Sequence, residues 1–298
     1  MPSEVDGFTY GAVTPVAAYL MACLGSALGL RCVVRTMHHR QGWKPGWLAL
    51  GAASIGCGIW TMHFIAMTGF TMEWTPIAYD VWLTVLSLAV AITVVSVGVF
   101  IVGYCGSSLG VLATAGMITG LGVAAMHYMG MAAMNFDGHV RYSTTGVTLS
   151  VLVAIAAATA ALWAAVSIKG FRSSLAASLV MAVAVTGMHY TGMAAATFHS
   201  DHLEGYEVGG RSPLSLLLPM LVGPAIFLTL ATVVVMFDPV LVAGDPQDHT
   251  PDSRRQAAPH PDATASSKHH DGPAPSRVDL FSDAPDPSRP PPSRTSRR

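Results

Sequence analysis

Charged residues are scarce in this chain. Only 11% of its 298 residues are Asp, Glu, Lys or Arg, whereas soluble domains contain about 25%. Hydrophobic residues make up 52% of the chain, and its mean hydropathy is +0.49. This composition excludes an ordinary soluble domain. It predicts a membrane protein whose main partner is the lipid bilayer, and we expect no nucleic-acid partner.

Cysteines and catalytic motifs are scarce as well. The four cysteines form no CxxC pair and indicate no disulfide framework, so we interpret them as small buried hydrophobic residues: Cys23, Cys32, Cys57 and Cys105. The sequence has no HExxH motif, no phosphate-binding glycine loop and no nucleophile beside a base. Its last apolar run contains no lysine for a retinal Schiff base. We therefore expect no enzymatic activity.

Seven apolar runs are long enough to span roughly 30 Å of hydrocarbon, which takes about 20 helical residues. They lie at Ala12–Val34, Trp47–Phe70, Val81–Gly103, Leu109–Met134, Thr145–Ile168, Ser174–Phe198 and Leu214–Phe237. Because the runs are continuous rather than alternating, they predict helices and not a β-barrel. The predicted fold is an all-α polytopic membrane protein with seven transmembrane helices.

One hexapeptide pattern, Met-His-aromatic-x-small-Met, occurs three times within these runs. The copies are Met62–Met67, Met126–Met131 and Met188–Met193. Composition alone predicts about 0.04 copies of Met-His-x-x-x-Met by chance. The three histidines are 64 and 62 residues apart, and Leu86–Ile92 resembles Leu149–Ile155 at a spacing of 63. We infer three parallel two-helix repeats, with the motif on the second helix of each pair, plus one extra helix.

The repeat also predicts the depth of the motifs. His63 and His127 lie seven residues before the predicted ends of their helices, and His189 lies nine before its own. At 1.5 Å per residue the three imidazoles lie at one level, roughly 10–14 Å below the outer helix ends. If the three helices are neighbours, the motifs face one shared cavity. Small residues on these helices are expected to allow close approach: Ala66, Gly130, Gly192, Gly58, Gly122 and Gly187.

The histidine and the last methionine of each motif are four residues apart, so they share one helix face. Imidazole with thioether suits copper, particularly Cu(I), whereas hard cations prefer oxygen and structural zinc prefers thiolate with imidazole. Haem, which takes His and Met as axial ligands, is a less favoured alternative. Three histidines and six methionines exceed what one copper ion needs, so one or two ions fit. Tyr128 and Tyr190 are candidates to orient a ligated imidazole, whereas Phe64 lacks the hydroxyl.

Charge in the loops predicts orientation. Basic residues gather in the first and fifth predicted loops: Arg35, Arg40, Lys44, Lys169 and Arg172. The positive-inside rule then predicts a multi-pass protein of the cell membrane with its N-terminus outside and its C-terminus in the cytoplasm. No basic residue precedes Arg31, so we expect no cleaved signal peptide. The expected organisation is an extracytoplasmic N-terminus (1–11), a six-helix membrane domain (12–200), an outer loop with the seventh helix (201–237) and a disordered cytoplasmic tail (238–298).

The triple motif on alternate helices resembles the MHYT domain, a bacterial integral-membrane sensory module, over about residues 10–200; Met188-His189-Tyr190-Thr191 spells the name in full. The resemblance implies a sensor of oxygen, carbon monoxide or nitric oxide that binds copper near the outer face. The implied ligands are Met62, His63, Met67, Met126, His127, Met131, Met188, His189 and Met193. Many relatives continue into cytoplasmic cyclic-dinucleotide or kinase output domains. The tail of this chain is too short for one, so we expect a stand-alone domain that signals through a separate cytoplasmic protein.

Two other functions stay open. The first is copper uptake or delivery to a copper enzyme, because methionine ligands hold Cu(I) without thiolates. The second is a structural role, in which the motifs form a hydrogen-bonded helix seam without metal. Motifs at a single depth favour a sensor over a transporter, which needs sites in series across the bilayer. The sequence leaves open the metal, the signal, the partner and the oligomeric state.

Overall fold

The computed structural model describes residues 11–38, 44–72, 75–168, 170–200 and 213–237, which form seven long helices. These are α1 (Val13–His38), α2 (Lys44–Thr68), α3 (Val81–Cys105), α4 (Leu109–Ala132), α5 (Thr144–Ser167), α6 (Phe171–Ala194) and α7 (Pro213–Met236). All seven are long and apolar enough to cross a bilayer. The prediction of an all-α, seven-helix, multi-pass membrane protein is confirmed. The tail predicted at 238–298 lies outside the described residues.

Four short strands join these helices and were not predicted. They are β1 (Ala78–Tyr79), β2 (Met134–Asn135), β3 (Gly138–Tyr142) and β4 (Ala196–Ser200). β1 pairs antiparallel with β2, and β3 pairs antiparallel with β4. As a result, the helices predicted to reach Met134 and Phe198 end at Ala132 and Ala194, because the chain enters β2 and β4 instead. Strands this short carry too little alternation to be recognised in a sequence.

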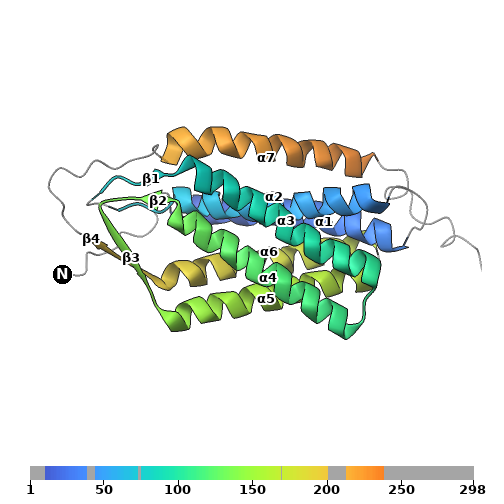
Figure 1. Cartoon of the computed structure of the whole chain (residues 1–298). Coiled ribbons are helices and arrows are strands. Elements are labelled where there is room, and N and C mark those ends of the chain that lie inside the picture. The colour runs from blue at the N-terminus through green and yellow to red at the C-terminus, as the bar shows by residue number, and fades with distance from the viewer. Residues whose placement is uncertain (1–10, 39–43, 73–74, 169, 201–212, 238–298) are drawn as a thin grey trace, which may run out of the picture. The chain divides into compact units, whose positions relative to one another are not determined.

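Six helices form a closed ring in chain order. Each of α1 to α6 packs against the next, and α6 packs back against α1. Figure 1 shows the helices running side by side along the bundle. The three motif helices, α2, α4 and α6, also contact one another pairwise across the ring. Helix α7 stands outside the ring and packs on α1 and α2, in agreement with its predicted place outside the repeat. The ring therefore brings the three motifs to a common centre.

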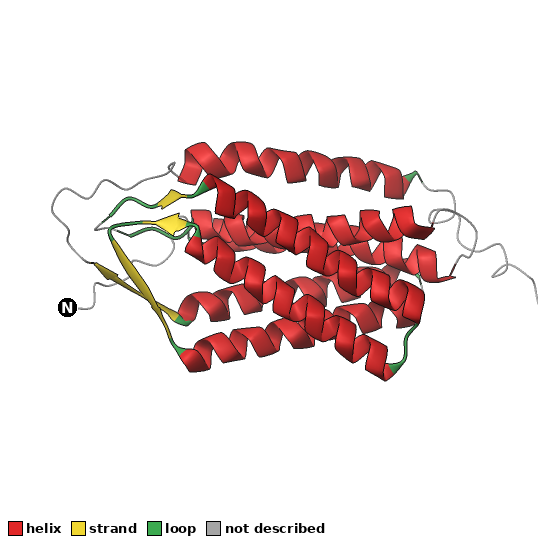
Figure 2. Cartoon of the chain, viewed as in Figure 1, coloured by secondary structure: helices red, strands yellow, loops and turns green. Residues whose placement is uncertain are grey.

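The two ends of the bundle differ in chemistry. All four strands lie at the end where α2, α4 and α6 terminate (Figure 2). At the opposite end the Arg35 guanidinium lies 4.1 Å from the centre of the Trp47 ring, and Lys44 Nζ lies 4.9 Å from that of Tyr104. The first turn of α6, at this same end, adds another basic residue at position 172. Most of the described basic residues thus gather where the positive-inside rule expects the cytoplasm, and the orientation itself stays a prediction.

Glycine allows the backbones of α1 and α2 to approach each other closely. A Cβ atom on Gly58 of α2 would lie 2.7 Å from Gly25 Cα of α1, and one on Gly25 would lie 2.6 Å from Gly58 Cα. Gly122 likewise faces the Val94 side chain of α3. The expectation of close approach is wrong for Gly187, which is exposed with nothing within 4 Å of such a Cβ. Gly58 and Gly122 precede their motif histidines by five residues, whereas Gly187 precedes His189 by two and so points elsewhere.

Alanine substitutions at Gly58 and Gly187 should distinguish the effect of packing on stability from the effect of helix propensity. Gly58→Ala should lower the melting temperature of the detergent-solubilised protein, because the methyl group meets backbone atoms of α1, and overpacking costs about 1–3 kcal/mol. Gly187→Ala should leave the melting temperature equal or higher, since alanine favours the helix and meets no neighbour. Thermal unfolding followed by size-exclusion chromatography measures both. Equal melting temperatures for the two variants would contradict the close α1–α2 contact.

Candidate metal centre

The three motif histidines meet inside the bundle. His63, His127 and His189 each lie five residues before the last residue of their helix, at Thr68, Ala132 and Ala194 (68 − 63, 132 − 127 and 194 − 189). Each side chain is only 1% exposed. The predicted common level is therefore confirmed. The depth is corrected to about 8 Å below the helix ends, at 1.5 Å per residue, because the helices end earlier than predicted.

The imidazoles converge through one atom each. The Nδ1 atom of His63 lies 3.0 Å from that of His189 and 3.2 Å from that of His127, and the third side of the triangle is 3.3 Å. The ring planes stand nearly perpendicular to one another, at 79° to 88°. The three rings thus form a pinwheel with near-threefold symmetry. We call this group the histidine triad.

The size of the triangle fits a metal ion. Nitrogen ligands about 2.0 Å from a tetrahedral ion lie about 3.3 Å from one another. The Nδ1–Nδ1 distances of 3.0 to 3.3 Å match this spacing, so all three lone pairs can reach one ion just outside their plane. Among the described residues no cysteine, aspartate or glutamate joins the group. The histidine triad is therefore a neutral, all-imidazole donor set that could hold a metal.

Protons alone cannot satisfy this triangle. A ring nitrogen of histidine is either a donor, when it carries a proton, or an acceptor, when it has its lone pair free. Each of the three nitrogens lies close to the other two, and only two roles are available. At least two nitrogens must therefore have the same role, so every combination of tautomers leaves at least one donor–donor or acceptor–acceptor contact. Buried polar atoms in such contacts are costly. A cation at the centre removes the conflict, because each Nδ1 atom then directs a lone pair at the ion and each Nε2 atom keeps the proton.

Glycine leaves space for the imidazoles of His63 and His127 on the side away from the centre of the triad, where their Nε2 atoms lie. The Nε2 atoms of His63 and His127 are buried and have no hydrogen-bond partner within the described part of the chain. A Cβ atom on Gly130 would collide with His63 Nε2, and one on Gly192 would collide with His127 Nε2. These glycines were predicted to let helices approach one another. The correction is that each one accommodates the imidazole of the preceding repeat.

The aromatic residue after each histidine packs against it edge-on. Ring centres are 4.7 Å apart for Phe64 and His63, 4.9 Å for Tyr128 and His127, and 5.0 Å for Tyr190 and His189. The Tyr128 hydroxyl pairs with Ser150 Oγ at 2.6 Å. Tyr128 was a candidate to orient the imidazole. It does not do so through a hydrogen bond, because its hydroxyl pairs with Ser150 instead. Ring packing alone explains why phenylalanine serves equally well in the first repeat.

The motif methionines are buried around the histidine triad. Five of them are at most 1% exposed, and Met193 is partly buried. The five are Met62, Met67, Met126, Met131 and Met188. Met67, Met131 and Met193 each lie one helical turn beyond a triad histidine, toward the strand end. Their role as ligands stays a prediction.

Aromatic side chains that sequence reasoning did not single out close the strand end. The Phe198 ring lies 4.9 Å from that of Phe70 and 5.8 Å from that of Phe136. Tyr79 on β1 is fully buried against Phe64, with ring centres 6.1 Å apart. Burial raises the pKa of the Tyr79 phenol, which therefore stays neutral. No spacing in the sequence marks these residues, because they follow helix ends rather than a periodic pattern.

Comparison with known proteins agrees with this geometry. The family described as bacterial signalling protein N terminal repeat, MHYT, matches residues 56–115 and again residues 120–178. The two matches begin 64 residues apart, which is also the distance from His63 to His127. No solved structure matches the chain.

Several curated relatives align with this chain. The bifunctional diguanylate cyclase/cyclic di-GMP phosphodiesterase MucR of Pseudomonas aeruginosa is 37% identical over 195 residues, 64% of this chain and 28% of MucR. The cyclic di-GMP phosphodiesterase NbdA of the same species is 39% identical over 209 residues, 65% of this chain and 26% of NbdA. The signaling protein YkoW of Bacillus subtilis is 31% identical over 201 residues, 65% of this chain and 25% of YkoW. This chain spans about a quarter of the length of these relatives. Its membrane part is an MHYT domain, as in bacterial signalling proteins.

Proposed function

We propose that this chain is an integral-membrane sensor that binds copper at the histidine triad and responds to oxygen, carbon monoxide, nitric oxide or a change of redox state. The observation that carries the proposal is the triangle of Nδ1 atoms, 3.0 to 3.3 Å on a side, which a cation satisfies and protons do not. The relatives support a signalling role, since their printed names are those of signalling proteins and cyclic di-GMP enzymes.

Copper is the metal that suits these donors. The triad supplies three imidazoles, and each motif adds thioethers one residue before and four residues after its histidine, all buried except that of Met193, which is partly buried. Soft thioether and imidazole ligands favour copper, and copper binds such sites more tightly than zinc in the general order of affinities. A copper ion held by three imidazoles would have a further position, which a diatomic gas could take in place of a thioether. The methionines at positions 67, 131 and 193 are the proposed additional ligands.

Signal transfer would run along the motif helices. The histidines lie near the strand end of α2, α4 and α6, and the basic residues lie at the other end of the bundle. We assign the strand end to the outside and the basic end to the cytoplasm, with residues 238–298 as a cytoplasmic tail. A separate signalling protein is the proposed recipient. A change in ligation at the triad would shift three helices together, because all three share the site.

The two rival functions meet physical objections. Transport needs a series of sites, but the side chains one turn inward of the triad are aliphatic: Ile59, Val123 and Val185. A metal-free seam leaves one pair of ring nitrogens in conflict in every tautomer. Delivery of copper to another protein begins with the same binding step as sensing and differs only in the fate of the bound ion. Metal analysis therefore comes first and gas response second.

Removing a triad histidine should remove the metal. Wild-type protein purified from copper-supplemented membranes should carry copper, and His127→Ala should lower its copper affinity at least about tenfold, by analogy with losses at metal sites. His139→Ala, on the exposed β3 strand, is the matched control and should keep wild-type copper content. Elemental analysis by mass spectrometry measures both. Unchanged copper in a variant lacking all three triad histidines would refute the site, and zinc in its place would refute the choice of metal.

A variant that keeps every ligand tests the geometry. In Gly130→Ala the new methyl group displaces the His63 ring through Nε2, so copper affinity should fall about 10- to 100-fold although no donor is lost. Gly110→Ala on the same helix meets nothing within 4 Å and is the control. Competition with a Cu(I) chelator gives the affinities, and the melting temperatures of the metal-free proteins report folding. Equal affinities for folded Gly130→Ala and wild type would argue against the triad as the binding site.

Methionine variants test which donors complete the site. Replacing Met67, Met131 and Met193 together by leucine should weaken Cu(I) binding by about tenfold or more, because thioethers prefer the soft ion, while Zn(II) binding should change little. Met181→Leu, two turns inward of His189 and also buried, is the control and should bind both ions normally. Parallel Cu(I) and Zn(II) titrations provide the measurement. Identical Cu(I) affinity in the triple variant would restrict the ligands to the imidazoles.

A further inference from the structure

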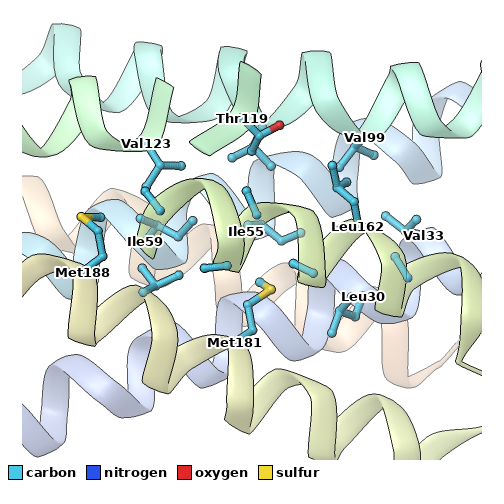
Figure 3. Close-up of a pocket in the computed structure, with 17 residues that line it drawn as sticks. Leu30, Val33, Ile55, Ile59, Val99, Thr119, Val123, Leu162, Met181 and Met188 are labelled. Carbon is cyan, nitrogen blue, oxygen red and sulfur yellow. The ribbon is translucent and has the colours of Figure 1, made fainter. Parts of the chain in front are cut away.

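A cavity continues the axis of the ring inward from the histidine triad. It is bounded by the residues four and eight positions before each triad histidine, which lie on the same helix faces one and two turns away. The first layer is Ile59, Val123 and Val185, and the second is Ile55, Thr119 and Met181. Met188, the neighbour of His189, also borders it (Figure 3). The cavity therefore extends to the layer of side chains one helical turn inward of the histidine triad.

Helix α5 borders this space with alanine. Ala154, Ala157, Ala158, Ala161 and Ala165 all line the cavity. At the repeat spacing of 63 residues, the positions on α3 that correspond to Ala158 and Ala165 hold Val95 and Val102. The side chains of α5 at these two positions are thus smaller than those of α3 and border a cavity of about 50 Å³, which all six helices of the ring line.

The chemistry of the lining selects its occupant. Thr119 carries the only hydroxyl among the lining side chains, and the others are Ala, Val, Leu, Ile or Met. A buried water needs about two to four polar partners, and apolar cavities stay dry and take up apolar molecules such as xenon. At about 50 Å³ the cavity is too small for a drug-sized ligand, whose pockets measure about 300–1,000 Å³. A small nonpolar molecule of two heavy atoms suits both the volume and the lining.

We propose that this cavity is a docking site for a nonpolar diatomic gas, from which the gas reaches the histidine triad. The binding of the gas is argued from the cavity alone. Its role as a signal rests on the copper sensor proposed above. Apolar solutes leave water for hydrocarbon spontaneously, so the bilayer around the bundle supplies the gas. The route then avoids the strand end, where Phe70, Phe136 and Phe198 pack together.

Xenon binding to the metal-free protein in nanodiscs tests the cavity without copper. Wild type should bind xenon, seen as a saturable shift in the xenon-129 NMR signal. Ala158→Leu should weaken binding about fivefold or more by filling the space, and Val95→Ala should strengthen it by enlarging the space. Ala176→Leu, at an exposed position of α6, is the control and should bind xenon as wild type does. Xenon binding equal in all variants, or a lipid chain found in the cavity by mass spectrometry, overturns the proposal.

The copper-loaded protein tests the connection to the triad. After flash photolysis of bound carbon monoxide, rebinding should be slower in Ala158→Leu and faster in Val95→Ala, at copper contents equal to wild type. Carbon monoxide rebinding rates that are the same in the cavity variants as in wild type would overturn the proposed route. Two failures are distinguishable: xenon binding that follows the variants in a protein that takes up no copper supports the gas site and refutes the copper sensor. Copper binding without xenon binding supports the copper sensor and refutes the gas site.

Discussion

Everything else in this structure depends on the convergence of three imidazoles on one point. The Nδ1 atoms approach to 3.0–3.3 Å, and the rings of His63 and His127 each have a glycine on their far side. At Gly130 and Gly192 any side chain would collide with an Nε2 atom. The motif is therefore a packing device as well as a donor set. Its histidine supplies the nitrogen, and its small residue supplies the space for another repeat's histidine.

These contacts link the three repeats to one another. Gly130 in the second repeat accommodates His63 from the first, and Gly192 in the third accommodates His127 from the second. Neither His63 nor His127 is accommodated by a glycine of its own repeat, so the site forms only when α2, α4 and α6 meet across the ring. The first repeat has Ala66 at the small position, and so the threefold symmetry is approximate. The alanines of α5 depart from it again where they line the cavity.

The sequence predicted the parts of this structure that repeat. Long apolar runs specified the helices, with ends correct to within four residues, and the motif spacing placed three histidines at one level. It could not predict β2 and β4, which are too short to show a period and which end α4 and α6 early. Nor could it assign Gly130 to an imidazole rather than a helix, because that contact joins residues 67 positions apart (130 − 63) through the tertiary fold. The cavity depends on the sizes of side chains from six helices that pack together. No local sequence pattern predicts it for that reason.

Burial of the triad also bears on the charge of the ion it would hold. All three imidazoles are 1% exposed, and among the described residues no carboxylate or thiolate joins them to offset a cation. The cost of moving an ion into a low-dielectric interior grows with the square of its charge, and even one elementary charge is expensive there. A divalent ion therefore meets about four times the penalty of a monovalent one at this site. This lower penalty is one reason why we propose Cu(I) rather than Zn(II), and the soft thioethers in the neighbouring turns are a second and separate one.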